Sequence, residues 1–502
     1  MLIDQRLDLK SHLIFDSRNF MSDMQSSSSQ ANLGKSKPKN ALHYTTVWRW
    51  HFYAGLFCIP FILWLSCTGL IYLFKPQIDA WYDRPYDHLN LQYVQPASKQ
   101  VQAALDAVPN TVFSAYEMPP NPDAATRVIL ADHDQLLKVY VHPETLDVLK
   151  VINQNDEFTR KIFLLHGEFM LGDTGSHIMQ IAAGWTVVLI ITGIFMWLGK
   201  GGKFKAAGML YPRLNRKDRA FWKDIHSVLG VWISIIVLFL IVSGLPWSAS
   251  WGAILKNLRQ WSVSTPVSAQ VQQDWTTSNT AERQHQQKMF VQTLEQQQKT
   301  AKPDQKSSMP HHGGMIHATN LDAKQQQTLD RIVVQTPNFA LAYPVLVKPE
   351  IVTMQQPWTV ESQAQNRTLR EKVFFDADGN ITHYKHFSDQ LFLDRVIAYG
   401  VAIHEGRYFG WLNVVIGVIT LVFLIIICNS AFEMWLRRKP PHVLGVPPII
   451  LSQRLSWSVR FCIILLGVIL PILGLSMIAV LILEKWIFSR VPKMAVFLGL
   501  SR

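Results

Sequence analysis

Cysteine and charged residues are both scarce in this chain. Only four of its 502 residues are cysteine, and 17% are charged against 49% hydrophobic. All four cysteines lie inside long apolar segments, so the sequence predicts neither a disulfide framework nor a thiolate metal site; they are Cys58, Cys67, Cys428 and Cys462. Apolar runs of about twenty residues are typical of a multi-pass membrane protein.

Several motifs of soluble enzymes are also missing. The chain has no Gly-rich dinucleotide loop, no phosphate-binding P-loop and no nucleophile triad. We therefore expect no nicotinamide or flavin site. Residues 1–40 are polar and Ser-rich and lack the apolar core of a signal peptide. We expect this tail to be disordered and cytosolic.

Positive charge is concentrated at one end of the apolar segments. The net charge is +12, and residues 200–223 alone hold eight Lys and Arg. Further basic residues precede the first apolar segment and follow the fourth. The positive-inside rule places these regions in the cytoplasm. The charge thus indicates orientation in a lipid membrane, with the N-terminus cytoplasmic, and not binding to nucleic acid.

Five spans are expected, with loops alternating between the two sides. The predicted order is a cytoplasmic tail (1–45), a first span (46–75), an outer module (76–165), a second span (166–199), a basic cytoplasmic loop (200–225), a third span (226–248), a second outer module (249–403), a fourth span (404–432), a cytoplasmic loop (433–458), a fifth span (459–484) and an outer tail (485–502).

Two of the spans share a spacing of histidine and glycine. A histidine is followed by glycine four and eighteen residues later: His51, Gly55 and Gly69 in the first span, and His226, Gly230 and Gly244 in the third. Eighteen residues make five helical turns, so these residues share one helix face and span about 27 Å. Each histidine is then near one leaflet, and its last glycine leaves room for a flat group near the other.

Two further histidines lie just before the other long spans. These are His166 and His404. Ionisable side chains at membrane depth are costly and usually functional. Topology pairs His51 with His226 at the inner ends and His166 with His404 at the outer ends, which predicts axial ligands for two haems. We expect Gly69 and Gly244 to make room for the outer haem.

Alternatives to these assignments remain open at the sequence level. His177 stands at the start of the second span and competes with His166 as the outer ligand, and His43 precedes His51 by eight residues. All four histidines also fit a simpler interpretation as headgroup-level residues. Three basic residues flank the histidines and could neutralise haem propionates: Arg49, Lys223 and Arg407.

The chain reads as an internal tandem duplication, each half being span, outer region, span. The first outer region predicts a helix (101–108), a strand (126–131) and a strand pair (136–152). The second predicts a helix (326–335) and a hairpin (370–387) that turns at Asp378-Gly379. A Gln-rich segment, 268–328, is expected to be a flexible insertion; it holds a His/Met-rich stretch (309–317) with weak metal-binding character.

These motifs together resemble the PepSY-associated transmembrane family, over residues 45–440. The resemblance rests on WRWHFYAG with Thr68-Gly69, on the hairpin VYVHPETLDVL, on LHGEFMLGDTG with MQIAAGW and ITGIFMWL, and on IHEGRYFGWLN. It departs from the pattern where the fourth span has Cys428-Asn429-Ser430 and the other three have Thr-Gly or Ser-Gly.

The resemblance implies an all-α membrane bundle with two small periplasmic α+β PepSY-like modules. It implies a bacterial inner-membrane reductase with two haem b that passes electrons outward to a periplasmic ferric siderophore or similar chelate. The electron donor is left as a quinol or a cytosolic reductase. The alternative from another functional class is a non-redox PepSY protein that binds a ligand or regulates a partner, in which the histidines only pack.

Overall fold

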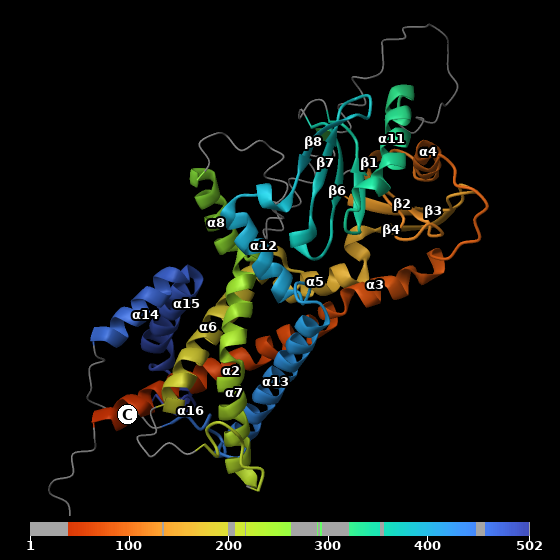
Figure 1. Cartoon of the computed structure of the whole chain (residues 1–502). Helices are drawn as coiled ribbons and strands as arrows, with labels where there is room; N and C mark the ends of the chain where they lie inside the picture. Colours follow the sequence, from red (N-terminus) through yellow and green to blue (C-terminus); the bar gives the residue numbers. More distant parts are fainter. Residues whose placement is uncertain are drawn as a thin grey trace, which may run out of the picture.

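The computed structural model describes residues 39–132, 135–198, 206–215, 217–262, 289, 292–293, 321–351, 356–447 and 457–500. Within these ranges, five helices are long and apolar enough to cross a membrane: α2 (Lys39–Leu73), α6 (Gly172–Leu198), α7 (Asp218–Gly244), α13 (Trp411–Leu436), and α15 (Pro471–Leu483) continued by the π-helical η8 (Glu484–Phe488). The protein is a mostly helical multi-pass membrane protein that also carries an antiparallel sheet (Figure 1).

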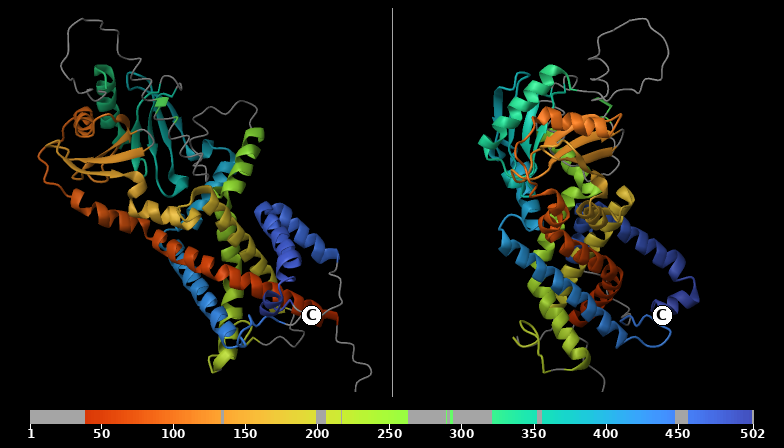
Figure 2. Two further views of the ribbon diagram at one scale, coloured as in Figure 1. Left: turned by 180° about the vertical axis from the view of Figure 1, so that it is seen from behind. Right: turned by 90° about the vertical axis from the view of Figure 1, so that its right-hand side faces the viewer.

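Helix α2 is longer than a membrane is thick. Its 35 residues correspond to about 52 Å, against about 30 Å of hydrocarbon. It therefore crosses the bundle obliquely and packs against α6 and α13 (Figures 1 and 2). α13 also packs along α7. Backbone groups in hydrocarbon must be satisfied within the segment, which explains why these apolar runs are helical.

Several predicted span boundaries differ from the structure. The helix α2 begins at Lys39, so residues 39–45 of the predicted disordered tail are helical, and α7 begins at Asp218, inside the predicted basic loop. The predicted second and fourth spans are each divided, because His166 lies on a separate helix, α5 (Phe158–Glu168), and His404 ends another, α12 (Phe392–His404). Left-handed backbone at Phe169, Met170 and the glycines after His404 breaks the helices there.

The two regions that the sequence predicted as outer modules form one continuous eight-stranded antiparallel sheet. Its order is β4-β3-β2-β1-β5-β6-β7-β8. The strands are β1 (Val112–Glu117), β2 (Thr126–Asp132), β3 (Gln135–Val141), β4 (Val148–Asn153), β5 (Val345–Lys348), β6 (Trp358–Ser362), β7 (Lys372–Phe375) and β8 (Ile381–Lys385). Pairing of β1 with β5 joins the two outer regions that the sequence predicted as separate modules.

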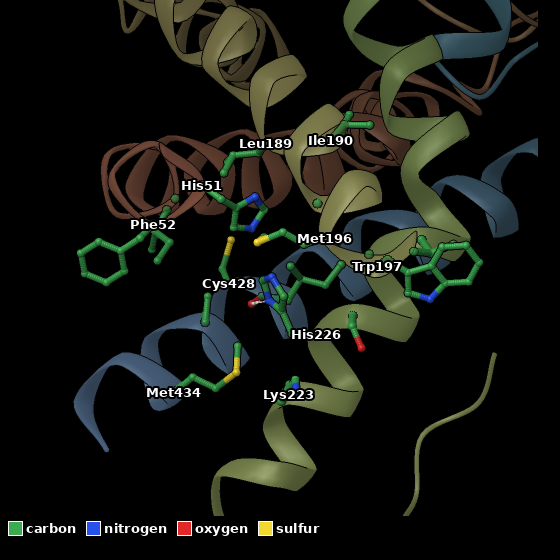
Figure 3. A pocket seen from close by; sticks show the side chains of 18 of the residues that line it. His51, Phe52, Leu189, Ile190, Met196, Trp197, Lys223, His226, Cys428 and Met434 are labelled. Atoms are coloured by element: carbon green, nitrogen blue, oxygen red, sulfur yellow. Dashed lines mark hydrogen bonds between the residues drawn. The ribbon is translucent and has the colours of Figure 1, made fainter. Parts of the chain in front are cut away.

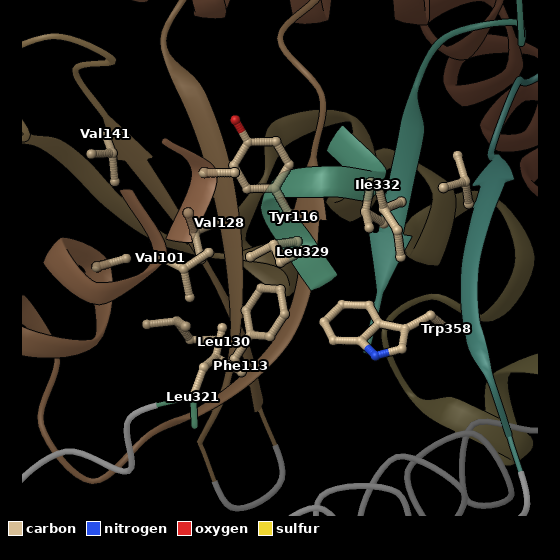
Figure 4. Packing of buried hydrophobic residues seen from close by; sticks show 14 of the residues in the cluster. Val101, Phe113, Tyr116, Val128, Leu130, Val141, Leu321, Leu329, Ile332 and Trp358 are labelled. Atoms are coloured by element: carbon tan, nitrogen blue, oxygen red, sulfur yellow. The ribbon is translucent and has the colours of Figure 1, made fainter. Parts of the chain in front are cut away.

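One hydrophobic core lies under both halves of this sheet. Helices α4 (Ala97–Ala107) and α11 (Ala323–Gln335) cover the same face and pack on each other. Phe113 and Val128 from the first half meet Leu329, Ile332 and Trp358 from the second (Figure 4). The alternating strand residues supply this core, as period-two patterning requires. The two halves therefore share one core and cannot be separated without exposing it.

The C-terminal boundary of the predicted insertion 268–328 extends too far into the folded domain. Leu321 is buried in the core, and Asp322 and Gln325 form a capping box at the start of α11. Residues 321–328 therefore belong to the folded sheet domain. The His/Met-rich stretch 309–317 lies outside the described residues.

Short elements connect the sheet to the bundle. The helices α3 (Lys75–Asp83), α5, α8 (Ala249–Ser262) and α12 lie between the two parts (Figure 1). The short 3-10 turns are η1 (Arg84–Tyr86), η2 (Gln154–Asp156), η3 (Leu245–Trp247), η4 (Thr336–Phe339), η6 (Arg367–Leu369) and η7 (Phe387–Asp389). Of these, η6 packs against α12 and so brings the second half of the sheet close to His404.

The predicted single span over 459–484 is a helical hairpin instead. Helix α14 (Trp457–Ile469) ends where Leu470 leaves helical geometry before Pro471, and α15 packs back against it (Figures 1 and 2). Pro471 cannot continue the preceding helix. The hairpin glycines are in close contact, since a Cβ on Gly474 would lie 2.6 Å from the Gly467 carbonyl oxygen.

The C-terminal segment consequently returns to the inner end of the bundle. Helix α16 (Pro492–Phe497) is followed by Leu498, whose carbonyl accepts from the Tyr53 hydroxyl, and by Gly499, whose carbonyl accepts from Arg49. The predicted placement of residues 485–502 on the outer side is therefore wrong. The hairpin reverses the chain, so the tail lies on the same side as the start of α2.

Candidate functional site

His51 on α2 and His226 on α7 face each other inside the bundle. Their ring centroids are 6.2 Å apart and their planes are perpendicular (Figure 3). Bonds of about 2 Å from one metal ion to a nitrogen of each ring would separate two imidazole centroids by about 6 Å. The structure thus brings the predicted inner pair together at a separation that suits a shared metal ion.

The proton on the His51 ring can be assigned from its surroundings. The Thr192 hydroxyl donates its hydrogen to the Val188 carbonyl one turn earlier in α6. Its oxygen lies 2.9 Å from His51 Nδ1 and can then only accept, so Nδ1 carries the proton. In a neutral ring this leaves the lone pair on Nε2, which is the arrangement a metal-ligating histidine requires.

His226 is held in the same way from α13. Its Nδ1 lies 3.2 Å from the Ile427 carbonyl oxygen and 3.2 Å from the Ser430 hydroxyl. A carbonyl can only accept, so Nδ1–H is the donor here as well. The Nε2 atoms of both inner histidines are therefore left free to bind a metal.

The outer histidines repeat this arrangement. His166 Nδ1 lies 2.9 Å from the Thr68 hydroxyl, and His404 Nδ1 lies 2.9 Å from the Ser243 hydroxyl. Each hydroxyl donates to the carbonyl four residues earlier in its own helix, so each accepts from its histidine. In all four predicted histidines a neighbouring helix thus holds Nδ1 and orients the ring, and Nε2 takes no part in these hydrogen bonds.

Burial lowers the pKa of both outer histidines below the usual value for histidine. Burial, with a smaller contribution from the nearby His404 ring, lowers the pKa of His166 to about 4. Burial likewise lowers the pKa of His404. The neutral imidazole is the form that binds a metal, so burial favours ligation.

The hydroxyl partners follow a pattern that was visible in the sequence but not interpreted. In each of the four spans a hydroxyl residue precedes a small one: Thr68-Gly69, Thr192-Gly193, Ser243-Gly244 and Ser430-Ala431. The fourth span follows the pattern of the other three more closely than the sequence suggested. Ser430, and not Asn429, takes the position of the hydroxyl residue that contacts a histidine. The hydroxyl orients the ring, and the small residue lets it approach the helix.

The two glycines predicted to make room for the outer haem contact histidine rings. A Cβ on Gly69 would lie 3.3 Å from His166 Cε1, and one on Gly244 would lie 3.5 Å from His404 Cε1. These two glycines admit the histidine rings themselves, which corrects the expectation that they face the porphyrin directly. Gly193 does the same for His51.

A cavity of about 640 Å³ surrounds the inner histidine pair. Its size falls within the roughly 300–1,000 Å³ typical of cofactor sites. The predicted Gly55 and Gly230 line it, and a Cβ on Gly230 would meet no atom within 4 Å. Leu189, Ile190 and other aliphatic side chains form most of the wall (Figure 3). The space is apolar and suits a flat hydrophobic group between the two rings.

Three cationic side chains line the inner end of this cavity. They are Arg219, Lys223 and Arg438. Burial and the neighbouring Arg219 lower the pKa of Arg438, which means that two guanidinium groups repel each other there. Such a cluster favours anionic groups, and the two carboxylates of haem fit it. The sequence predicted Lys223 but missed the other two.

Two predicted propionate partners donate to backbone carbonyl groups. Arg49 donates to the carbonyls of Pro447 and Gly499 and does not line the cavity, so it ties down the C-terminal segment. Arg407 donates from Nη2 to the Leu73 carbonyl, 2.7 Å away, and caps the end of α2. Its Nε is buried and has no hydrogen-bond partner in the described part of the chain.

The alternative histidines are less well placed. His177 lies half-buried in the first turns of α6, and within the described ranges it makes no hydrogen bond, whereas His166 is fixed against α2. His43 lies in α2, but its side chain is outside the described residues. No cluster of three or more His, Cys, Asp or Glu able to hold a metal is found where the chain is described. Paired histidines suffice for haem, whose ring supplies the other ligands.

Thr192→Val is expected to weaken inner haem binding by roughly ten- to a hundredfold, as is typical when a partner of a metal ligand is lost. The change removes the acceptor for His51 Nδ1–H and frees the ring to rotate. Haem retention through purification, measured from the pyridine haemochrome spectrum, checks it. Thr420→Val is the matched control, since Thr420 is equally buried and donates to Ile416 without a histidine partner. Equal loss in both variants would contradict the assignment.

Comparison with known proteins supports a family assignment. The model of the family described as the PepSY-associated TM region matches residues 48–438. This range includes all four histidines, their hydroxyl partners and the whole sheet. No curated protein matches the chain.

Proposed function

The chain belongs to the PepSY-associated transmembrane family, and we propose that it is a haem-b-dependent reductase that passes electrons across the bacterial inner membrane to a periplasmic ferric siderophore or similar chelate. The observation that carries this proposal is the fourfold arrangement of half-buried histidines whose Nδ1 atoms are held by neighbouring helices and whose Nε2 atoms are free. A membrane protein has no structural need for four such rings, because burying polar groups in hydrocarbon is costly.

The two pairs lie at different depths along α2 and α7, although His166 and His404 themselves are on α5 and α12. On α2, His51 belongs to the inner pair and Thr68 orients an outer histidine; on α7, His226 and Ser243 do the same. Seventeen residues correspond to about 26 Å of helix. Two sites at these depths would divide the crossing into short steps.

Two histidines on one iron leave no open position for a substrate. Haem held in this way would accept and release single electrons. The residues of the chain support such a role, since the hydroxyls on α2, α6, α7 and α13 fix the four rings and the apolar wall excludes water. The cations Arg219, Lys223 and Arg438 would hold the carboxylates of the inner haem.

We propose that the basic inner end is cytoplasmic and that the sheet faces the periplasm, as the positive-inside rule indicates. The two halves of the sheet would then be PepSY modules that arose by tandem duplication; each contributes four antiparallel strands and one covering helix. A ferric chelate would be reduced at this face. Reduction to Fe(II) weakens the bonds to hard oxygen ligands and would release iron for uptake. Electrons would come from a quinol or a cytosolic reductase.

The optical spectrum of the purified protein in detergent tests this proposal. We expect low-spin b-type bands, and re-oxidation of the dithionite-reduced protein by a ferric siderophore. A protein that stays colourless when expressed with ample haem would overturn the haem assignment and favour a non-redox ligand-binding or regulatory role. Haem that ferric chelates do not re-oxidise would overturn the reductase assignment alone.

A further inference from the structure

Arginine Nε atoms without hydrogen-bond partners gather between the sheet and the outer end of the bundle. The Nε atoms of Arg367, Arg395 and Arg407 are buried and lack a hydrogen-bond partner among the described residues, although each residue as a whole is half-buried. A buried guanidinium group normally pairs with a carboxylate, because leaving it unpaired is costly. Such atoms point to an anion that the protein chain itself does not supply.

Arg367 comes from the sheet domain but reaches the outer histidine site. Its guanidinium carbon lies 4.9 Å from the centre of the Trp247 ring. Trp247 ends η3, which directly follows Gly244, and Gly244 contacts the His404 ring. The turn η6 that carries Arg367 packs on α12, the helix that ends at His404. Arg367 therefore packs at the end of the helix that carries Gly244, and its turn contacts the helix that ends at His404.

Arg407 approaches the same region from the other side. It lies three residues after His404, and its Nη2 donates to the Leu73 carbonyl at the end of α2. Both Arg367 and Arg407 interact electrostatically with the neighbouring Tyr72 hydroxyl. Tyr72 is three residues after Gly69, which contacts the His166 ring. Arg367 and Arg407 thus both act on a residue that lies one turn beyond Gly69 on α2.

Two carboxylates also lie near these arginines. Glu405 and Asp79 both act on the Tyr72 hydroxyl, and Asp79 is already engaged by Lys75 and by the Thr159 hydroxyl. Burial lowers the pKa of Arg407 although Glu405 opposes the shift.

We propose that Arg367, carried by the sheet, and Arg407 bind the carboxylates at the outer edge of the outer haem, so that the sheet domain completes this haem site and sets its reduction potential. This inference rests on the proposed function. Arg–carboxylate pairs are bidentate and strong in a dry setting. They also favour reduction, because the added electron is closer to positive charge. A ligand bound by the sheet would then act directly on the potential of the outer haem.

Spectroelectrochemical titration of Arg367→Gln tests the inference. We expect the reduction equilibrium of the outer haem to become about tenfold less favourable, which corresponds to about 59 mV for one electron, while the inner haem is unchanged. Arg367→Lys should recover most of the shift, because it keeps the charge. Arg331→Gln is the matched control, since Arg331 lies on α11 and donates to the Asp378 carbonyl, far from η6; it should not shift either haem.

A second measurement separates haem carboxylates from those of a substrate. Binding of ferric citrate to the oxidised protein should be equal in the wild type and in Arg367→Gln. An unchanged outer potential, with or without weaker citrate binding, would overturn the inference, and weaker binding would assign Arg367 to the chelate. A wild-type protein that contains no haem at all would instead refute the proposed function, so the two failures are distinguishable. If Arg367→Gln does not fold, Arg407→Gln provides the same titration.

Discussion

His51→Ala or His226→Ala is expected to remove the inner haem and to leave the outer haem in place, which halves the haem content. Either change deletes one of the two rings that face each other across 6.2 Å. The outer rings are held by Thr68 and Ser243, near the opposite ends of the same helices, so they should keep their positions. Pyridine haemochrome analysis and low-temperature optical spectra measure the loss and identify the haem that remains.

Matched histidine variants serve as controls for this result. His166→Ala and His404→Ala should produce the complementary loss of the outer haem, and His177→Ala should lose neither, because His177 is not fixed against a neighbouring helix. Unchanged pigment in both inner variants would contradict the inner pair. A loss in His177→Ala with none in His166→Ala would move the outer ligand to the start of α6.

Gly69→Leu is expected to remove the outer haem, and Gly193→Leu the inner one. A Cβ at either position would already lie 3.3 Å from the ring of the neighbouring histidine, His166 or His51, and the rest of a leucine would force that ring away. Overpacking alone typically costs about 1–3 kcal/mol, and a displaced ring also loses its bond to iron. Haem-specific spectra should show at least a tenfold decrease in occupancy of the affected site.

The reciprocal design distinguishes this effect from general helix packing. Small residues also let membrane helices approach closely, and disruption of packing would lower stability and deplete both haems together. Selective loss at opposite sites in the two variants supports contact with the histidines. Loss of the inner haem in Gly69→Leu would mean that the pairing of histidines with helices is inverted.

Local sequence signals were sufficient to identify the first four membrane helices and the histidines that lie near their ends. Apolar length identifies a span, and the eighteen-residue spacing from His51 to Gly69 fixes a shared helix face without knowledge of the fold. Positive charge at the inner ends then paired His51 with His226, and the structure brings these rings together. Their role as haem ligands remains a prediction.

Interactions between distant segments could not be predicted from local sequence signals. The hydroxyl of Thr192 is 141 residues from His51 in sequence, and Ser430 is 204 from His226. Serine and threonine are common in membrane helices, so no local feature marks the four that orient a ring. Basic residues near a histidine were equally ambiguous: Lys223 lines the cavity, whereas Arg49 binds backbone carbonyls of the C-terminal segment.

The sequence by itself determined the first four membrane helices, which histidines lie near their ends and which hairpins form in the outer regions, because helix and strand periodicity depend on neighbouring residues. Only the tertiary structure decided that β1 pairs with β5 to form one sheet, that α14 and α15 fold back as a hairpin, and that Arg367 reaches the outer site. Strand edges and helix faces can each be satisfied by several partners, and the choice depends on how all the elements pack at once.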